Sequence, residues 1–160
     1  MKIFLELEVE NEKEQKIVDD FMNAMVKDLR NLLYGHRDEI EYYKIEKAIL
    51  NSKLILWRSK QKPKEINVEQ VVVDIIKAIK WYRHKDNKFI IQIDRSKKFM
   101  NTNTQLTTIA NFIEYGNPYS LPLHFFSRYF NEFANKARIY WSSYKQLRTQ
   151  IKVKEIVTVI

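Results

Sequence analysis

The stretch Ile109–Phe133 constrains the fold most, because it concentrates residues that either free or restrict the backbone. It contains one of only two glycines and two of the three prolines in the chain. Gly116 can take a positive φ that other residues avoid, whereas Pro118 and Pro122 fix φ in the loop that follows. The stretch therefore predicts an apolar segment, a sharp turn at 114–118, a stiff loop and the start of an amphipathic helix.

Helical periodicity dominates the sequence on both sides of this turn. Asn11 is the expected N-cap of a long helix that ends near Gly35, a C-cap glycine. Asn67 is the expected cap of a second helix, which Trp81–Tyr82 closes, and the helix after the turn is expected to end near Lys145. The apolar stripes are Ile17, Phe21, Ala24, Met25, Leu29, Leu32 and Leu33; Val68, Val71, Val72, Ile75, Ile76 and Ile79; and Leu123, Phe126, Phe130, Phe133, Ala134, Ala137 and Trp141.

Three segments predict β-strands. Residues Lys2–Val9 alternate between apolar and mostly polar side chains, which is typical of a half-buried strand. Lys88–Asp94 is rich in β-branched and aromatic residues, and the tail Ile151–Ile160 alternates less cleanly, as a strand at a sheet edge or paired with a neighbour. Together these elements predict an α+β fold, with a small mixed or antiparallel sheet packed by three to four helices, in a single domain of residues 1–160.

The remaining segments are less regular. Asp38–Ile49 is a weaker helix candidate, and the apolar run Lys53–Ser59 fits either a strand or a helix end. His84–Lys88 reads as a charged turn and Arg95–Thr104 as an exposed loop or hairpin tip. Gln105–Tyr115 is expected to be a short helix or strand that leads into the sharp turn.

Composition excludes several classes of protein. Cysteine is absent, which excludes disulfides and thiol chemistry, and no apolar run approaches the length of a membrane helix. The N-terminal stretch turns acidic after a few residues, so it is not expected to be a signal peptide.

The formal net charge of +8 is distributed unevenly. Residues 1–20 carry seven acids, whereas residues 136–154 carry six bases and no acid. An acidic front and a basic back would favour head-to-tail contact between copies, and the alternative is ordinary solvated surface.

Motifs for catalysis or metal binding are not found. His36, His84 and His124 lie on separate segments without metal-ligand spacing, and two glycines are too few for a phosphate-binding loop. Glu114 is the one acid in a distinctive context, where it would cap or brace the turn. We therefore expect no catalytic residue, no metal and no cofactor, with a small enzyme of unrecognised type as one alternative.

Nucleic-acid binding is the stronger alternative. Lys53–Lys64 and Arg95–Lys98 are basic, and the nearby Trp57 and Phe99 are of the type that stacks on single-stranded bases. The short signatures of known DNA- and RNA-binding modules are missing, however, and most aromatics fall on helical core stripes. A basic nucleic-acid-binding module therefore remains an alternative function.

The stretch around the turn resembles the signature of small bacteriophage tail-completion and head–tail joining proteins. That signature is an apolar segment, Glu-aromatic-Gly-Thr, a polar loop, Pro-Ala, an Arg-Pro-Phe-like triplet and a helix. Phe112–Gly116 matches its first part, with Asn117 in place of threonine. Leu121–Leu123 occupies the position of Pro-Ala in the signature, and His124–Phe126 occupies that of the triplet. Arg128 matches the arginine that follows, and Tyr129 replaces a common proline. The residues of this turn and its anchors are Glu114, Tyr115, Gly116, Pro122, Phe125, Phe126 and Arg128.

The resemblance implies a structural virion protein of a tailed phage, located in the neck or tail after assembly in the host bacterial cytoplasm. Copies would form a sixfold or twelvefold ring that joins the capsid connector to the tail around the DNA channel. Partners would be portal, adaptor or tail-tube proteins, with non-specific DNA contact and no membrane. Arg95, Lys97 and Lys98 would face a partner protein or DNA, and assembly by surface complementarity would replace catalysis.

Overall fold

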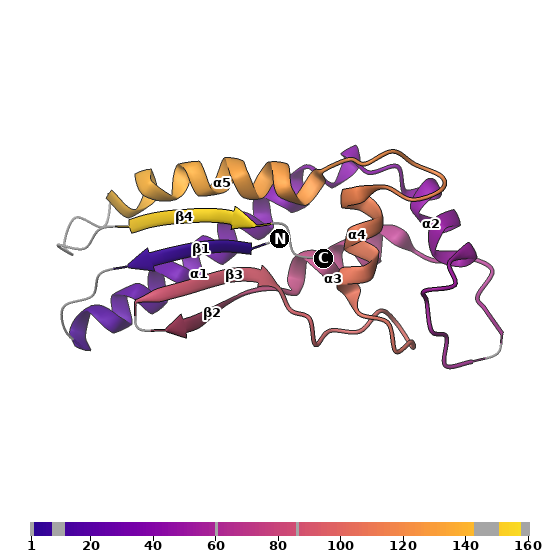
Figure 1. Cartoon of the computed structure of the whole chain (residues 1–160), viewed down its shortest axis with the longest axis horizontal. Coiled ribbons are helices and arrows are strands. Elements are labelled where there is room, and N and C mark those ends of the chain that lie inside the picture. The colour runs from indigo at the N-terminus through magenta and orange to yellow at the C-terminus, as the bar shows by residue number, and fades with distance from the viewer. Residues whose placement is uncertain (1, 8–11, 60, 86, 143–150, 158–160) are drawn as a thin grey trace.

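The computed structural model describes residues 2–7, 12–59, 61–85, 87–142 and 151–157. A four-stranded antiparallel sheet occupies one part of the molecule, and a cluster of short helices and loops occupies the other (Figure 1). The elements in chain order are β1 (Lys2–Leu7), α1 (Glu12–Gly35), the 3-10 helix η1 (Arg37–Glu39), α2 (Tyr42–Asn51), α3 (Val68–Lys77), β2 (Ile79–Lys85), β3 (Lys88–Ile93), α4 (Leu106–Tyr115), α5 (Phe125–Ser142) and β4 (Ile151–Val157).

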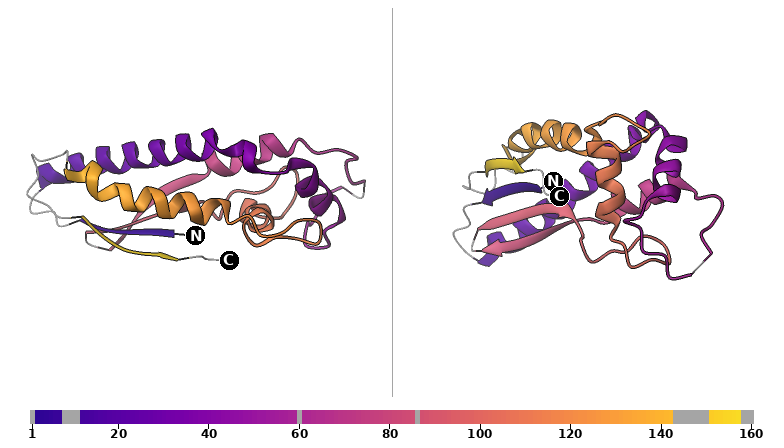
Figure 2. Two further views of the ribbon diagram at one scale, coloured as in Figure 1. Left: turned by 90° about the horizontal axis from the view of Figure 1, so that it is seen from above. Right: turned by 45° about the vertical axis from the view of Figure 1, so that its right-hand side comes forward.

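The sheet has the strand order β2-β3-β1-β4, and two long helices cover one of its faces. Alternate residues of β1, including Ile3, Leu5 and Leu7, are buried, as the alternation in the sequence predicts. Seen from above, α1 and α5 lie side by side on the same side of the sheet (Figure 2). The α+β class is therefore confirmed, and the sheet is antiparallel throughout.

The short helices form a second packed group beyond the end of the sheet. α3 packs against α1, α2 and α4, and α4 also packs against α5. Asn67 caps α3 as expected, because its side-chain oxygen accepts the Gln70 N–H at 3.1 Å. This group positions α4 and the turn that follows it next to the first turn of α5.

The helix that Asn67 caps is shorter than the sequence predicted. It ends at Lys77, and the segment from Ile79 through Trp81–Tyr82 is strand β2 instead of the end of a helix. β2 forms a hairpin with β3 in which Ile79 faces Ile93. Ile79 satisfies both the helical stripe and the strand pattern, and pairing with β3 favours the strand.

Other boundaries also differ. Tyr42–Asn51 is helical as α2, but Arg37–Glu39 is a separate 3-10 turn, and Lys53–Ser59 is neither strand nor helix. Leu106–Tyr115 is helical as α4, and β4 confirms the tail strand at a sheet edge, beside β1. Among the described residues, no helix is long and apolar enough to cross a membrane.

The acidic front and the basic back lie next to each other where the structure describes their backbones. β1 pairs with β4, and their register places Glu6 opposite Lys152. α1 and α5 also pack against each other, so both stretches lie along the same side of the fold wherever the structure describes them. The pairing of β1 with β4 and of α1 with α5 brings the two stretches together where the structure describes them, and their role in a head-to-tail contact stays a prediction.

Asp94 organises the loop that leaves β3. Its carboxylate accepts the Ser96 hydroxyl at 2.7 Å and the Ser96 N–H at 2.9 Å, and it lies 3.2 Å from the Lys80 ammonium. These hydrogen bonds, with the nearby charge of Lys80, lower the pKa of Asp94 to about 2.

The variant Asp94→Asn is expected to lower the free energy of unfolding at neutral pH by about 1 to 2 kcal/mol. Because the pKa is lowered in the folded state, this stabilisation is complete above the unfolded-state pKa and is lost as pH falls towards about 2. Denaturant titrations between about pH 7 and pH 2 should show the two proteins converging in acid. The exposed Asp20→Asn serves as the control. A difference that stays constant with pH would contradict this assignment.

Candidate interaction site at the turn between α4 and α5

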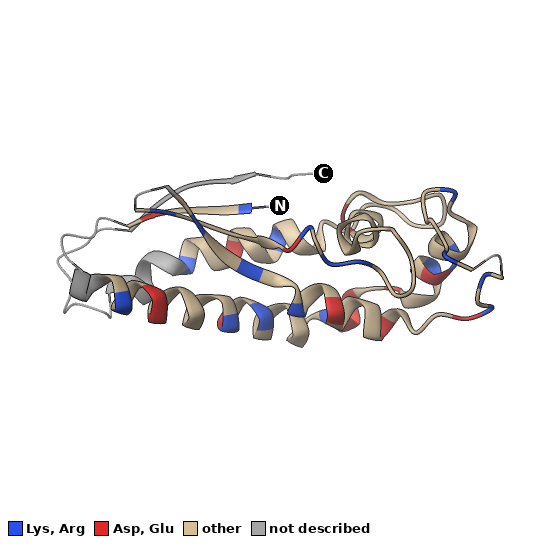
Figure 3. Ribbon diagram, turned by 90° about the horizontal axis from the view of Figure 1, so that it is seen from below, with Lys and Arg blue, Asp and Glu red and all other residues tan. Residues whose placement is uncertain are grey.

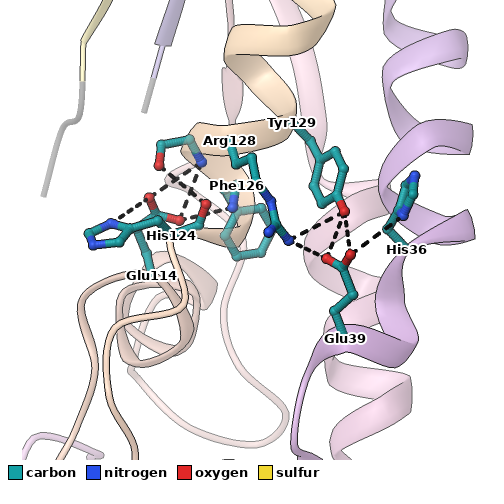
Figure 4. A network of polar contacts seen from close by, with 8 residues as sticks. His36, Glu39, Glu114, His124, Phe126, Arg128 and Tyr129 are labelled. Atoms are coloured by element: carbon teal, nitrogen blue, oxygen red, sulfur yellow. Dashed lines mark hydrogen bonds and ion pairs between the residues drawn. The ribbon is translucent and has the colours of Figure 1, made fainter.

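Glu114 in the last turn of α4 caps the beginning of α5. Its side chain is fully buried and accepts the backbone N–H of Phe126 at 2.9 Å and that of Ser127 at 3.3 Å (Figure 4). The first N–H groups of a helix have no partner within the helix, and a negative charge there is favoured by the helix dipole. Glu114 is thus an N-terminal cap supplied by a different helix.

Backbone N–H groups just before α5 also donate hydrogen bonds to carbonyls at the end of α4. The N–H groups of Leu123 and His124 donate to the carbonyls of Ile113 and Glu114, each at 3.2 Å. His124 has a φ of 51°, and its Nδ1 lies 3.7 Å from the Glu114 carboxylate. The end of α4 and the start of α5 therefore satisfy each other's unpaired backbone groups.

Gly116 makes this close return possible. Its φ is 85°, and a Cβ at this position would lie 2.9 Å from the Pro122 nitrogen and 3.0 Å from the Ser120 carbonyl oxygen. Asn117 and Ser120 exchange two backbone hydrogen bonds, which closes the loop between Gly116 and Pro122. A residue with a side chain at position 116 would be both strained and crowded.

The two phenylalanines of the motif anchor the turn in the core. Phe125 and Phe126 are fully buried, with ring centroids 5.1 Å apart in an edge-to-face arrangement. Tyr115 is half-buried, and its hydroxyl has no hydrogen-bond partner in the described part of the chain. Burial, and the nearby Glu114, raise the pKa of Tyr115.

A second polar network ties α5 to η1. Arg128 forms an ion pair with Glu39, and the Tyr129 hydroxyl donates to the same carboxylate at 2.6 Å. His36 stacks on Tyr129 with ring centroids 4.4 Å apart (Figure 4). Burial and the hydrogen bond to Glu39 raise the pKa of Tyr129. Sequence reasoning identified Arg128 but missed Glu39 and His36, since no local pattern links residues about 90 positions apart.

Beside the turn, the loop and α2 enclose a shallow cavity of about 210 Å³. Leu121 projects at its edge with 88% of its surface exposed. The lining is mainly apolar, with two carboxylates and one ammonium at its rim: Glu39, Ile40, Glu41, Lys44, Ile45, Ile113, Ser120, Leu121, Pro122 and Leu123. The outside of the turn is therefore a rigid, apolar projection next to a hollow.

The basic loop lies elsewhere. Arg95, Lys97 and Lys98 are exposed, as expected, but they precede α4, whereas the turn follows it. Phe99 is fully buried, with the partly buried Trp57 packed edge-to-face on it at 6.0 Å. The structure brings the seven motif residues together and places the three basic residues at the opposite end of α4.

The two carboxylates at the centre of this site make structural contacts. The carboxylates of Glu114 and Glu39 are engaged by helix amides, an arginine and a tyrosine hydroxyl. Within the described residues, no group of three or more His, Asp and Glu side chains is arranged to hold a metal ion. The arrangement can hold a loop rigidly in a position where another molecule can contact it.

Comparison with protein-family models, curated proteins and solved structures finds no match.

The variant Gly116→Ala is expected to destabilise the protein by about 1 to 3 kcal/mol, because alanine is strained at a φ of 85° and its Cβ meets Pro122. Gly35→Ala is the matched control, since nothing lies within 4 Å of a Cβ there. Thermal unfolding of both variants measures the difference. Equal melting temperatures would contradict the close return of the loop.

The variant Glu114→Gln is expected to cost about 1 to 3 kcal/mol, because it removes the charge from a buried cap while retaining its shape. Glu132→Gln on the exposed side of α5, where the carboxylate pairs only with Lys136 among the described contacts, should change stability by less than about 0.5 kcal/mol. Urea titration distinguishes the two. A Glu114→Gln variant as stable as Glu132→Gln would show that the capping charge contributes nothing.

Proposed function

We propose that the protein is a structural virion protein of a tailed bacteriophage. Copies form a sixfold or twelvefold ring at the head–tail interface, as a neck, tail-completion or tail-terminator component. The ring joins the capsid connector to the tail around the DNA channel, and its partners are portal, adaptor or tail-tube proteins. The protein acts by assembly and not by catalysis.

The observation that carries this proposal is the turn from Glu114 to Phe126. Its sequence resembles the phage joining signature, and its geometry suits a contact element. The buried polar groups support the backbone, while Leu121 and Tyr119 face solvent.

One observation favours the second candidate function, a basic nucleic-acid-binding module. The segments 53–64 and 95–105 contain eight lysines and arginines and no acid. Phe99 is buried and Trp57 packs against it, so these aromatics are not arranged to stack on single-stranded bases. This candidate is therefore limited to electrostatic contact with the phosphate backbone.

The proposed function predicts a closed ring. Native mass spectrometry and negative-stain electron microscopy of the concentrated protein should show six or twelve copies around a central opening. A monomer at all concentrations, combined with duplex-DNA binding that weakens steeply with salt, would favour the nucleic-acid-binding module instead. Adding a tail-tube or portal protein provides the control for assembly that requires a partner.

A further inference from the structure

Two loops that are far apart in the sequence form one continuous surface below α4. The Leu56 N–H donates to the Thr104 hydroxyl at 2.8 Å, and the Asn103 N–H donates to the Leu56 carbonyl at 3.1 Å. Trp57 and Thr102 form an antiparallel bridge. Because the backbones are joined and Thr102 and Thr104 are buried, the loops have a fixed relative position. We call this the two-loop surface: Leu54, Leu56, Arg58, Lys98 and Met100.

The two-loop surface combines exposed apolar side chains with cations. Leu54, Leu56 and Met100 expose 68%, 59% and 56% of their surfaces. Arg58 and Lys98, one from each loop, both reach Asn103. Lysines and arginines mark both loops (Figure 3). Clustered apolar side chains at this exposure are typical of a binding surface.

A second apolar surface lies at the other end of α4. Leu121 and Tyr119 expose 88% and 42% of their surfaces beside the cavity described above. Glu39 and Glu41 stand at the rim of that cavity. We call this the motif-loop surface: Glu39, Glu41, Tyr119 and Leu121.

The two surfaces are separated by α4, whose ten residues correspond to about 15 Å of helix. The loops of the two-loop surface lie below α4 in Figure 1, and the motif loop lies above it. The right-hand view in Figure 2 keeps the same separation. A head-to-tail contact requires two different patches on one chain, and such contacts form a ring when the rotation between successive copies closes.

The composition of the two-loop surface favours a protein over a nucleic acid as its occupant. Phosphates would pair with Arg58 and Lys98 but would leave Leu54, Leu56 and Met100 without an apolar partner. The motif-loop surface offers both an apolar hollow and carboxylates. Each carboxylate already pairs within its own chain, Glu39 with Arg128 and Glu41 with Lys44, so a second cation would contribute orientation more than affinity.

We propose that the two-loop surface of one copy docks on the motif-loop surface of the next copy. The inference rests on the proposed ring, and it specifies which surfaces form the contact between subunits. Apolar side chains of the two-loop surface enter the hollow beside Leu121, while Arg58 and Lys98 face Glu39 and Glu41.

The absence of cysteine allows a direct test by cross-linking. The variants Leu56→Cys and Leu121→Cys are mixed at equal concentration and treated with a short bismaleimide. The mixture should yield cross-linked dimer about tenfold faster than Leu56→Cys mixed with Asp20→Cys, an exposed control on α1, because docking raises the local thiol concentration. The double variant should form longer cross-linked series, whereas each single variant alone should not. Met100→Cys replaces Leu56→Cys if that variant fails to fold.

Several outcomes would overturn the inference. If the wild type forms rings but Leu56→Cys and Leu121→Cys cross-link no faster than the control, the subunit contact lies elsewhere and the proposed function stands. If the wild type forms no ring, alone or with a tail-tube or portal protein, and no pair cross-links above the control, both proposals fail. If a short duplex DNA protects the thiol of the Leu56→Cys variant from the maleimide while cross-linking stays at the control rate, the surface binds nucleic acid instead.

Discussion

The reciprocal capping between α4 and α5 is the constraint on which the rest of the structure depends. α4 belongs to the group of short helices, and α5 lies along the sheet beside α1. The Glu114 carboxylate holds the first amides of α5, and the amides of Leu123 and His124 hold the last carbonyls of α4. Each helix end therefore needs the other, and the turn fixes how the helix group joins the sheet.

A buried carboxylate also explains the unusual residues around it. Removing a charge from water is costly unless hydrogen bonds replace the lost hydration. Glu114 obtains those bonds only if the chain turns back within a few residues, and this return needs the positive φ of Gly116 and of His124. Phe125 and Phe126 offset part of this strain by burial in the core. Glu114, Gly116 and the two phenylalanines therefore depend on one another structurally. The sequence alone shows only that they are close neighbours in the chain.

Which elements the sequence could predict depends on how far apart in the chain the interacting residues lie. The β1 alternation, the stripe of α1 and the Asn67 cap are local patterns, and the structure confirms all three. Ile79 fits a helical stripe and a strand equally well, and only its pairing with Ile93 decides between them. Glu39 and Arg128, or Trp57 and Thr102, meet across long separations that no single-sequence pattern records. The motif turn was found because glycine and proline act locally, whereas its partners on η1 and the pairing of the two basic loops required the fold.

The distinction between local sequence patterns and contacts that only the fold creates also applies to charge. In the sequence, the acidic front and the basic back are separated by more than a hundred residues and suggest two opposed surfaces. In the fold, β1 and β4 are adjacent, and their register places Glu6 opposite Lys152. A charge asymmetry that orients one copy relative to another must then come from charged side chains that the fold holds apart from side chains of opposite charge. The loops around Arg58 and Lys98 meet this condition, since their segments contain no acid and α4 separates them from Glu39 and Glu41. In the proposed ring, the charges that orient one copy against the next would therefore come from the helix group.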